Sequence, residues 1–140
     1  MWALRSETLE EHDLAGALDL VARQLSGDHD VKVRVSGPRR RLPAEVENNL
    51  LRIGQEALAN AARHAHADEI SVDLRFGEGV VRLSVRDDGC GFDVEHAAQA
   101  TSGHFGLAGI RERVHNLGGE LNLLSRPGQG SEVVVEVPVA

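Results

Sequence analysis

The sequence predicts an α+β domain, a two-layer α/β sandwich in which a mixed five-stranded sheet is covered on one face by three helices. Apolar residues recur at helical spacing in three segments and alternate with polar residues in five others. The strands come in adjacent pairs, which favours antiparallel or mixed pairing over an all-parallel sheet. At 140 residues, the chain has the length of one ordinary domain.

Three segments carry the apolar stripe of a helix. Residues 14–25 form the first, and Gly27 ends it. The longest begins at Pro43, where a missing N–H costs nothing, and runs to about His64. Residues 107–117 fit a short third helix that is closed by two glycines.

Five segments alternate as strands do. They are residues 31–35, 70–76, 81–86, 120–124 and 132–137. The turn Gly77-Glu78-Gly79 joins the second to the third and is typical of a β-hairpin. A loop rich in glycine and alanine runs from Asp88 to about His104, before the third helix.

Composition excludes several classes of function. Lys and Arg number 15 against 22 Asp and Glu, and the basic run at 39–41 is too short for a nucleic-acid interface. Aromatic residues make up only 3%, which argues against base stacking. The single cysteine permits no internal disulfide, and no apolar stretch approaches the ~20 residues that span a bilayer. We therefore expect a cytoplasmic domain that contacts neither nucleic acid nor membrane.

A polar stripe lies beside the apolar one on the longest helix. Glu56, Asn60 and His64 are spaced i, i+4 and i+8, so they share one face. A solvated helix face would explain them. A carboxylate, an amide and a cation in a row also suit a divalent metal and phosphates, because Mg²⁺ takes oxygen ligands and keeps several waters.

Asp87 continues the parity of Val81, Leu83 and Val85, which predicts that its side chain points to the apolar side of the sheet. A carboxylate there costs several kcal/mol unless a donor meets it. A strand-ending Asp-Gly turn accounts for Asp88 but not for the parity of Asp87. A purine amino group is a suitable donor, and the glycines that follow would let the backbone approach a flat ring.

Two glycine-rich turns complete the candidate site. Gly103-His104-Phe105-Gly106-Leu107-Ala108-Gly109 opens the third helix, where backbone N–H groups favour anions. Gly128-Gln129-Gly130-Ser131 precedes the last strand. A flexible loop and a hairpin turn would explain each motif taken alone.

In order and spacing, these motifs resemble the ATP-binding superfamily shared by gyrase, MutL, a heat-shock chaperone and histidine kinases. The resemblance covers roughly residues 14 to 138. Residues 55–65, QEALANAARHA, look like the asparagine box of histidine kinases. Residues 106–114, GLAGIRERV, with Leu117-Gly118-Gly119, are similar to the sensor kinases that include nitrate, nitrogen-regulatory and thermosensing members.

The resemblance implies that the ligands are ATP and Mg²⁺. Asn60 would ligate the metal, and Glu56 would hold a metal-bound water or assist proton removal. Arg63 and His64 would lie near the phosphates or the ribose, and Asp87 would accept from the adenine amino group. The other residues expected at the nucleotide are Gly89, Gly91, Gly103, Gly106, Leu107, Gly109 and Ser131, with a lid at about residues 93–104.

The same resemblance implies a domain organisation. Residues 14–140 would be the catalytic ATP-binding domain, and residues 1–13 would end a preceding linker or dimerisation region. The domain would donate the γ-phosphoryl group to a histidine on a separate dimerisation domain, upstream of a response regulator with a helix-turn-helix output domain. Glu11-His12-Asp13 imitates a phosphoacceptor, but the chain before Glu56 is too short for a two-helix hairpin as well, so His12 is not expected to be one.

Two alternatives stay open. An anti-sigma-factor serine kinase has the same fold and would phosphorylate a serine on an antagonist protein. A nucleotide-binding module would bind without transfer. The Arg-Glu-Arg-Val motif and the Pro-Gly-x-Gly-Ser turn favour the histidine kinase, and the presence of Glu56, Asn60 and Asp87 argues against a mere module.

Overall fold

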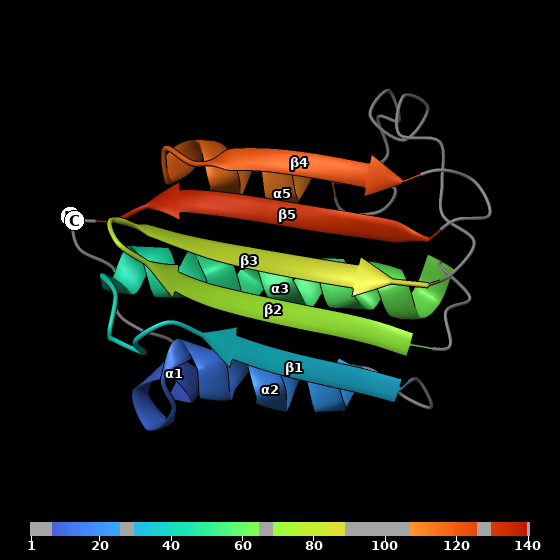
Figure 1. Ribbon diagram of the computed structural model, residues 1–140, viewed down its shortest axis with the longest axis horizontal. Coiled ribbons are helices and arrows are strands. Elements are labelled where there is room, and N and C mark those ends of the chain that lie inside the picture. Colours follow the sequence, from blue (N-terminus) through green and yellow to red (C-terminus); the bar gives the residue numbers. More distant parts are fainter. Residues whose placement is uncertain (1–6, 26–29, 65–68, 89–106, 126–129, 140) are drawn as a thin grey trace.

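The computed structural model describes residues 7–25, 30–64, 69–88, 107–125 and 130–139. A sheet forms one layer and the helices lie behind it, so the predicted sandwich is confirmed (Figure 1). The three predicted helices are α2 (Leu14–Leu25), α3 (Ala44–His64) and α5 (Leu107–Asn116). A short helix that the pattern did not predict, α1 (Glu7–Glu11), lies beside α2. No helix in the described ranges is long and apolar enough to cross a membrane.

The sheet is mixed, as predicted. Its strands are β1 (Asp30–Ser36), β2 (Glu69–Gly77), β3 (Val80–Asp87), β4 (Glu120–Ser125) and β5 (Ser131–Pro138). They are arranged in the order β1-β2-β3-β5-β4, with β1 parallel to β2 and every other pair antiparallel. A parallel pair needs a long crossover, and α3 supplies it between β1 and β2.

The core lies between the sheet and the helices. Alternate residues of β2 and β3 point into it, including Leu74 and Leu83, each 1% exposed. They meet the apolar stripes of α2 and α3, where Leu18 and Leu50 are fully buried. Gly54 allows these two helices to approach closely, because a Cβ there would lie 2.6 Å from Leu18 Cδ2.

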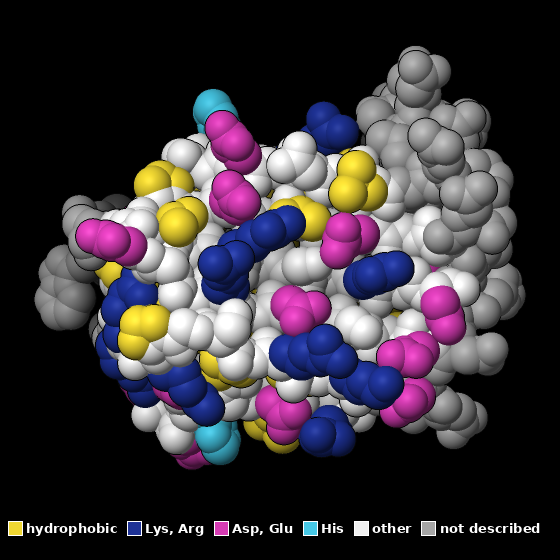
Figure 2. All heavy atoms as spheres, in the orientation of Figure 1, with side chains coloured by type: hydrophobic (Ala, Val, Ile, Leu, Met, Phe, Trp, Pro, Cys, Tyr) yellow, Lys and Arg dark blue, Asp and Glu magenta, His cyan; other side chains and the backbone are white. Residues whose placement is uncertain are grey.

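The opposite face of the sheet carries charged side chains instead of a second helical layer (Figure 2). Lys32 Nζ lies 3.1 Å from Glu69 Oε1, and Arg82 Nε lies 3.8 Å from Glu136 Oε1. Pairs of opposite charge across neighbouring strands suit a face that meets water. Burial of only one face explains the alternation seen in the sequence.

The basic run at 39–41 serves the fold. Arg39 Nη2 donates to Asp13 Oδ1 and Oδ2, each at 2.8 Å, just before α2. Arg40 donates to the carbonyl oxygen of Gly77 at 2.9 Å, and its guanidinium lies 5.6 Å from the centroid of the Phe76 ring. These arginines therefore tie the entry to α2 and the β2–β3 turn to the loop before α3.

The third arginine pairs with a buried carboxylate that the sequence pattern did not reveal. Glu47 is fully buried in the first turns of α3, and its Oε1 lies 3.2 Å from Arg41 Nη1. Arg41 also donates to the carbonyl oxygen of Leu9 in α1 at 2.8 Å. Leu9 is itself fully buried, so α1 packs onto the domain through both its side chain and its backbone.

Asp13 caps α2 by accepting from the backbone N–H of Gly16 at 2.9 Å. The hydrogen bonds from Arg39 lower the pKa of Asp13 below its ordinary value of 3.8, although partial burial acts in the opposite direction. A lowered carboxyl pKa means that the stabilisation is complete above pH 3.8 and is lost as the pH falls through the pKa of the folded state.

We predict that Asp13→Asn, which keeps a capping oxygen but loses the charge, lowers the free energy of unfolding at neutral pH by a measurable amount of roughly 0.5–1 kcal/mol. The difference from the parent protein should shrink and vanish as the pH falls below 3.8. Urea denaturation at several pH values measures this. Equal stability of the two proteins at neutral pH would contradict the prediction.

Candidate functional site

Two members of the polar stripe of α3 are half-buried rather than freely solvated. Glu56 and Asn60 both have intermediate exposure and share one face of the helix. The first turns of α5 pack against this face, since a Cβ placed on Gly109 would lie 3.0 Å from Glu56 Oε2. The structure thus brings Gly109, which was expected at the nucleotide, against the carboxylate of Glu56.

A second contact joins the same two helices. Arg113 Nη1 of α5 donates to Asn49 Oδ1 of α3 at 3.1 Å, and Asn49 Nδ2 donates to the carbonyl oxygen of Glu45 at 2.8 Å. The sequence analysis missed this pair. A signal was present, since Asn49 lies seven residues before Glu56 and therefore on the same face of α3.

Asp87 is the last residue of β3 and is only 7% exposed, as the strand alternation predicted. It lies opposite Ile70 of β2 and Ser131 of β5. The hydroxyl of Ser131 donates a hydrogen bond to Asp87 Oδ2. Two residues chosen from separate motifs therefore meet, and Ser131 offsets part of the cost of burying the carboxylate.

The neighbouring aspartate has a different environment. Asp88 is exposed, and its Oδ1 accepts from the backbone N–H of Glu69 at 3.0 Å. This contact closes the end of the β2–β3 pair. The turn predicted at Asp88-Gly89 continues outside the described residues. Gly130 has a φ of +78°, and a Cβ there would collide with the carbonyl oxygen of Asp87, so this close approach requires glycine.

Several predicted site residues cannot be placed. Arg63 and His64 form the end of α3 and Leu107 begins α5, but only their backbones are among the described parts of the chain. Outside the described residues altogether lie Gly89, Gly91, Gly103, Gly106 and the predicted lid. The roles assigned to all of these remain predictions.

The placed residues gather at one end of the sandwich. The carboxyl end of β3, the start of β5 and the last turns of α3 lie together at the right of Figure 1. Among the described residues, no group of three His, Cys, Asp or Glu side chains is arranged to hold a metal ion. Glu56 and Asn60 offer a carboxylate and an amide oxygen, which fit Mg²⁺ if water and phosphate oxygens supply its other ligands.

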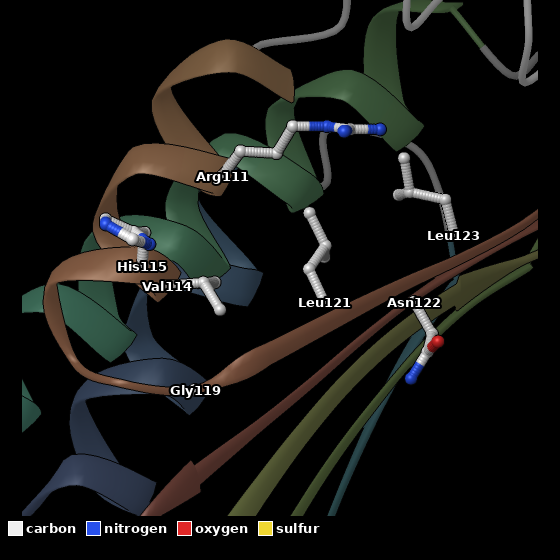
Figure 3. A pocket seen from close by; sticks show the side chains of 7 residues that line it. All are labelled: Arg111, Val114, His115, Gly119, Leu121, Asn122 and Leu123. Carbon is white, nitrogen blue, oxygen red and sulfur yellow. The ribbon is translucent and has the colours of Figure 1, made fainter.

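Two of the hollows are lined wholly by described residues, and neither of these two includes Glu56 or Asn60. One, of about 300 Å³, is lined by Glu69, Ser71, Arg86, Asp87 and Asp88. The other, of about 310 Å³, lies between α5 and β4 and is lined by Arg111, Val114, His115, Gly119, Leu121, Asn122 and Leu123 (Figure 3). The first hollow adjoins Asp87, and the second contains no predicted site residue.

Comparison with known proteins agrees with this chemistry. A family profile described as histidine kinase-, DNA gyrase B- and HSP90-like ATPase matches residues 45–140. DegS of Bacillus subtilis, a signal transduction histidine-protein kinase/phosphatase, is 36% identical over 100 residues, which cover 71% of this chain and 26% of DegS. The nitrate/nitrite sensor NarX of Escherichia coli is 35% identical over 91% of this chain and 21% of NarX.

Solved structures show the same fold. Full-length ShkA in complex with AMPPNP superposes with a TM-score of 0.77 and 27% identity, over 92% of this chain and 30% of ShkA. The histidine kinase domain of the blue-light activated kinase EL346 from Erythrobacter litoralis superposes with a TM-score of 0.71 and 28% identity, over 90% of this chain and 61% of that domain.

The chain spans about a quarter of the length of DegS and about a fifth of NarX. It thus corresponds to the ATP-binding part of such sensor kinases. On the family profile, the related sequences and the shared fold, the chain belongs to the histidine kinase-, DNA gyrase B- and HSP90-like ATPase family.

Proposed function

We propose that this domain binds Mg-ATP and donates the γ-phosphoryl group to a histidine on a separate dimerisation domain. The observation that carries the proposal is the buried carboxylate of Asp87 at the end of β3. That end of β3 lies beside the last turns of α3, the helix that bears Glu56 and Asn60 (Figure 1). A carboxylate buried at the end of a strand needs donors. Ser131 gives one, and the amino group of adenine would give another.

This arrangement would select the base. Adenine presents an amino group to Asp87, whereas guanine presents a carbonyl oxygen at the corresponding position, and two acceptors repel each other. Asp87 would therefore orient the nucleotide and favour ATP over GTP. Ser131 would keep the carboxylate in place before the base arrives.

The α3 stripe would serve the phosphates. The amide oxygen of Asn60 would hold Mg²⁺, which neutralises phosphate charge when bound. Glu56 would hold a water of the metal or accept a proton. In the transfer, the bond from the γ-phosphorus to the β–γ bridging oxygen breaks, a phosphorus–nitrogen bond to the histidine forms, and ADP leaves. The domain contributes positioning and charge neutralisation to this step.

The named relatives support a proposal about the partners. DegS, NarX and LiaS of Bacillus subtilis, which is 31% identical over 97% of this chain, are all named as sensors or signal-transducing kinases. We infer a histidine-bearing dimerisation domain as the direct partner and a response regulator with a helix-turn-helix output domain as the indirect one. We assign the domain to the cytoplasm, where ATP is available.

A phosphotransfer assay tests the proposal. The chain is incubated with radiolabelled ATP, Mg²⁺ and either a separately produced dimerisation domain or an anti-sigma antagonist protein. Acid-labile label on histidine is the expected result. Acid-stable phosphoserine on the antagonist would overturn the proposal in favour of a serine kinase, and ATP binding without any transfer would identify a nucleotide-binding module.

We predict that Asp87→Asn weakens ATP binding about tenfold or more, because an amide can turn a donor toward the adenine amino group and leave two donors facing each other. Isothermal titration calorimetry measures the change. The matched control is Asp88→Asn at the exposed neighbour, which should leave the affinity within about twofold. Unchanged affinity in Asp87→Asn would sink the adenine assignment.

We also predict that Asn60→Ala abolishes most of the Mg²⁺ dependence of ATP binding, because it removes the amide oxygen that would ligate the metal. Titrations with and without Mg²⁺ give the ratio of the two affinities. A suitable control is Asn116→Ala at the exposed end of α5. An equally metal-dependent affinity in Asn60→Ala and in the parent protein would count against this role.

A further inference from the structure

Two of the contacts between α5 and α3 lie on one face of each helix. On α5, Gly109 and Arg113 are four residues apart and therefore neighbours on the helix surface. On α3, their partners Glu56 and Asn49 are seven residues apart and share a face. The later residue of α5 meets the earlier residue of α3, so the two helices run antiparallel along this contact.

The Arg113–Asn49 contact is anchored at both ends of the amide. Asn49 Oδ1 accepts from Arg113 Nη1 at 3.1 Å, and its Nδ2 donates to the carbonyl oxygen of Glu45 one turn earlier, at 2.8 Å. Both Arg113 and Asn49 are half-buried. An amide with both groups engaged has one preferred orientation, so this contact sets where α5 lies along α3.

The position of α5 in turn limits the space around Glu56. A Cβ on Gly109 would lie 3.0 Å from Glu56 Oε2 and 3.5 Å from Oε1. The carboxylate therefore packs directly against the backbone of α5. If α5 slid or rotated, its backbone would no longer pack against the carboxylate in the same place, and the Glu56 side chain could adopt other rotamers.

From this geometry we propose that Asn49 and Arg113 are positioning residues that hold Glu56 in place through α5. Neither residue was predicted to touch nucleotide or metal. The proposal rests on the proposed function in one respect only: the task of Glu56 at the phosphates. The placement of the Glu56 carboxylate can be measured without any activity.

Arg111 provides a matched control on the same helix. It lies two residues before Arg113, and Figure 3 shows its side chain reaching over the hollow between α5 and β4, toward Leu123. The Arg111 side chain has no ion pair with any residue in the described ranges. Arg111→Ala thus removes the same chemical group from α5 without touching the contact with α3.

The first measurement is the carbon-13 chemical shift of the Glu56 carboxyl carbon, assigned with Glu56→Gln, at one fixed pH. Arg113→Ala and Asn49→Ala should move this resonance, and Arg111→Ala should leave it in place. Arg113→Lys keeps a hydrogen-bond donor, so its Glu56 resonance should lie close to that of the parent protein. An unmoved Glu56 resonance in both Arg113→Ala and Asn49→Ala would overturn the proposal.

The second measurement is ATP turnover. We expect Arg113→Ala to lower kcat about tenfold with KM for ATP within about twofold, because small misplacements of a catalytic group cost rate more than binding. In a Glu56→Gln background, the same substitution should change kcat by less than about twofold. An equal loss in both backgrounds would mean that Arg113 does not act through Glu56.

Gly109→Ala tests the contact between α5 and Glu56 directly, by adding a methyl group next to the carboxylate. This variant is expected to stay folded, so it keeps the proposal testable if the other substitutions destabilise the domain. Alanine favours a helix, so the melting temperature should stay the same or rise, while the Glu56 resonance moves and kcat falls. If these substitutions move the Glu56 resonance but the parent protein transfers no phosphoryl group from ATP to a dimerisation domain, the proposed function is refuted and the positioning is not. A normal kcat with an unmoved resonance in Gly109→Ala would refute the positioning alone.

Discussion

The burial of only one face of the sheet is the constraint from which the rest of the structure follows. Because α2, α3 and α5 cover that face alone, a polar side chain on the covered side has to find a partner there. Asp87 finds Ser131, and Glu47 finds Arg41 and the backbone N–H of Leu42. The first pair lies where a nucleotide would bind, whereas the second fastens the start of α3. The same physical demand therefore serves function at one end of the domain and stability at the other.

Helix α3 connects these two ends. Its apolar stripe packs on the sheet, its first turns are held through Glu47, and its polar face bears Asn49, Glu56 and Asn60. The segment before it, with Arg39 and Arg40, reaches both the entry to α2 and the β2–β3 turn. A rigid α3 is useful to a domain whose proposed work is positioning, since phosphoryl transfer depends on placing charges rather than on forming bonds to protein.

Most of the secondary structure could be predicted because apolar spacing is a local property of the chain. The three longer helices and all five strands lie within one or two residues of their predicted ends. Helix α1 was missed because five residues with one buried leucine, Leu9, carry no periodic signal. Glu47 was missed because a glutamate near the start of a helix is usually solvent-exposed, and its burial depends on Arg41 six residues earlier folding back over it. The Arg113–Asn49 contact joins residues 64 positions apart. The spacing from Glu56 placed Asn49 on the polar face of α3, but no local pattern showed that Arg113 would be its partner.

The sequence by itself determined the fold class, because alternation and helical stripes are local properties of the chain, and its motifs already resembled the family that comparison then confirmed. The parity of β3 alone was enough to predict that Asp87 is buried. Only the tertiary structure decided the strand order, the pairing of Asp87 with Ser131 and the packing of Gly109 against Glu56. These depend on which distant segments become neighbours when the covered face closes, and that is settled by the packing of the whole core rather than by any local pattern.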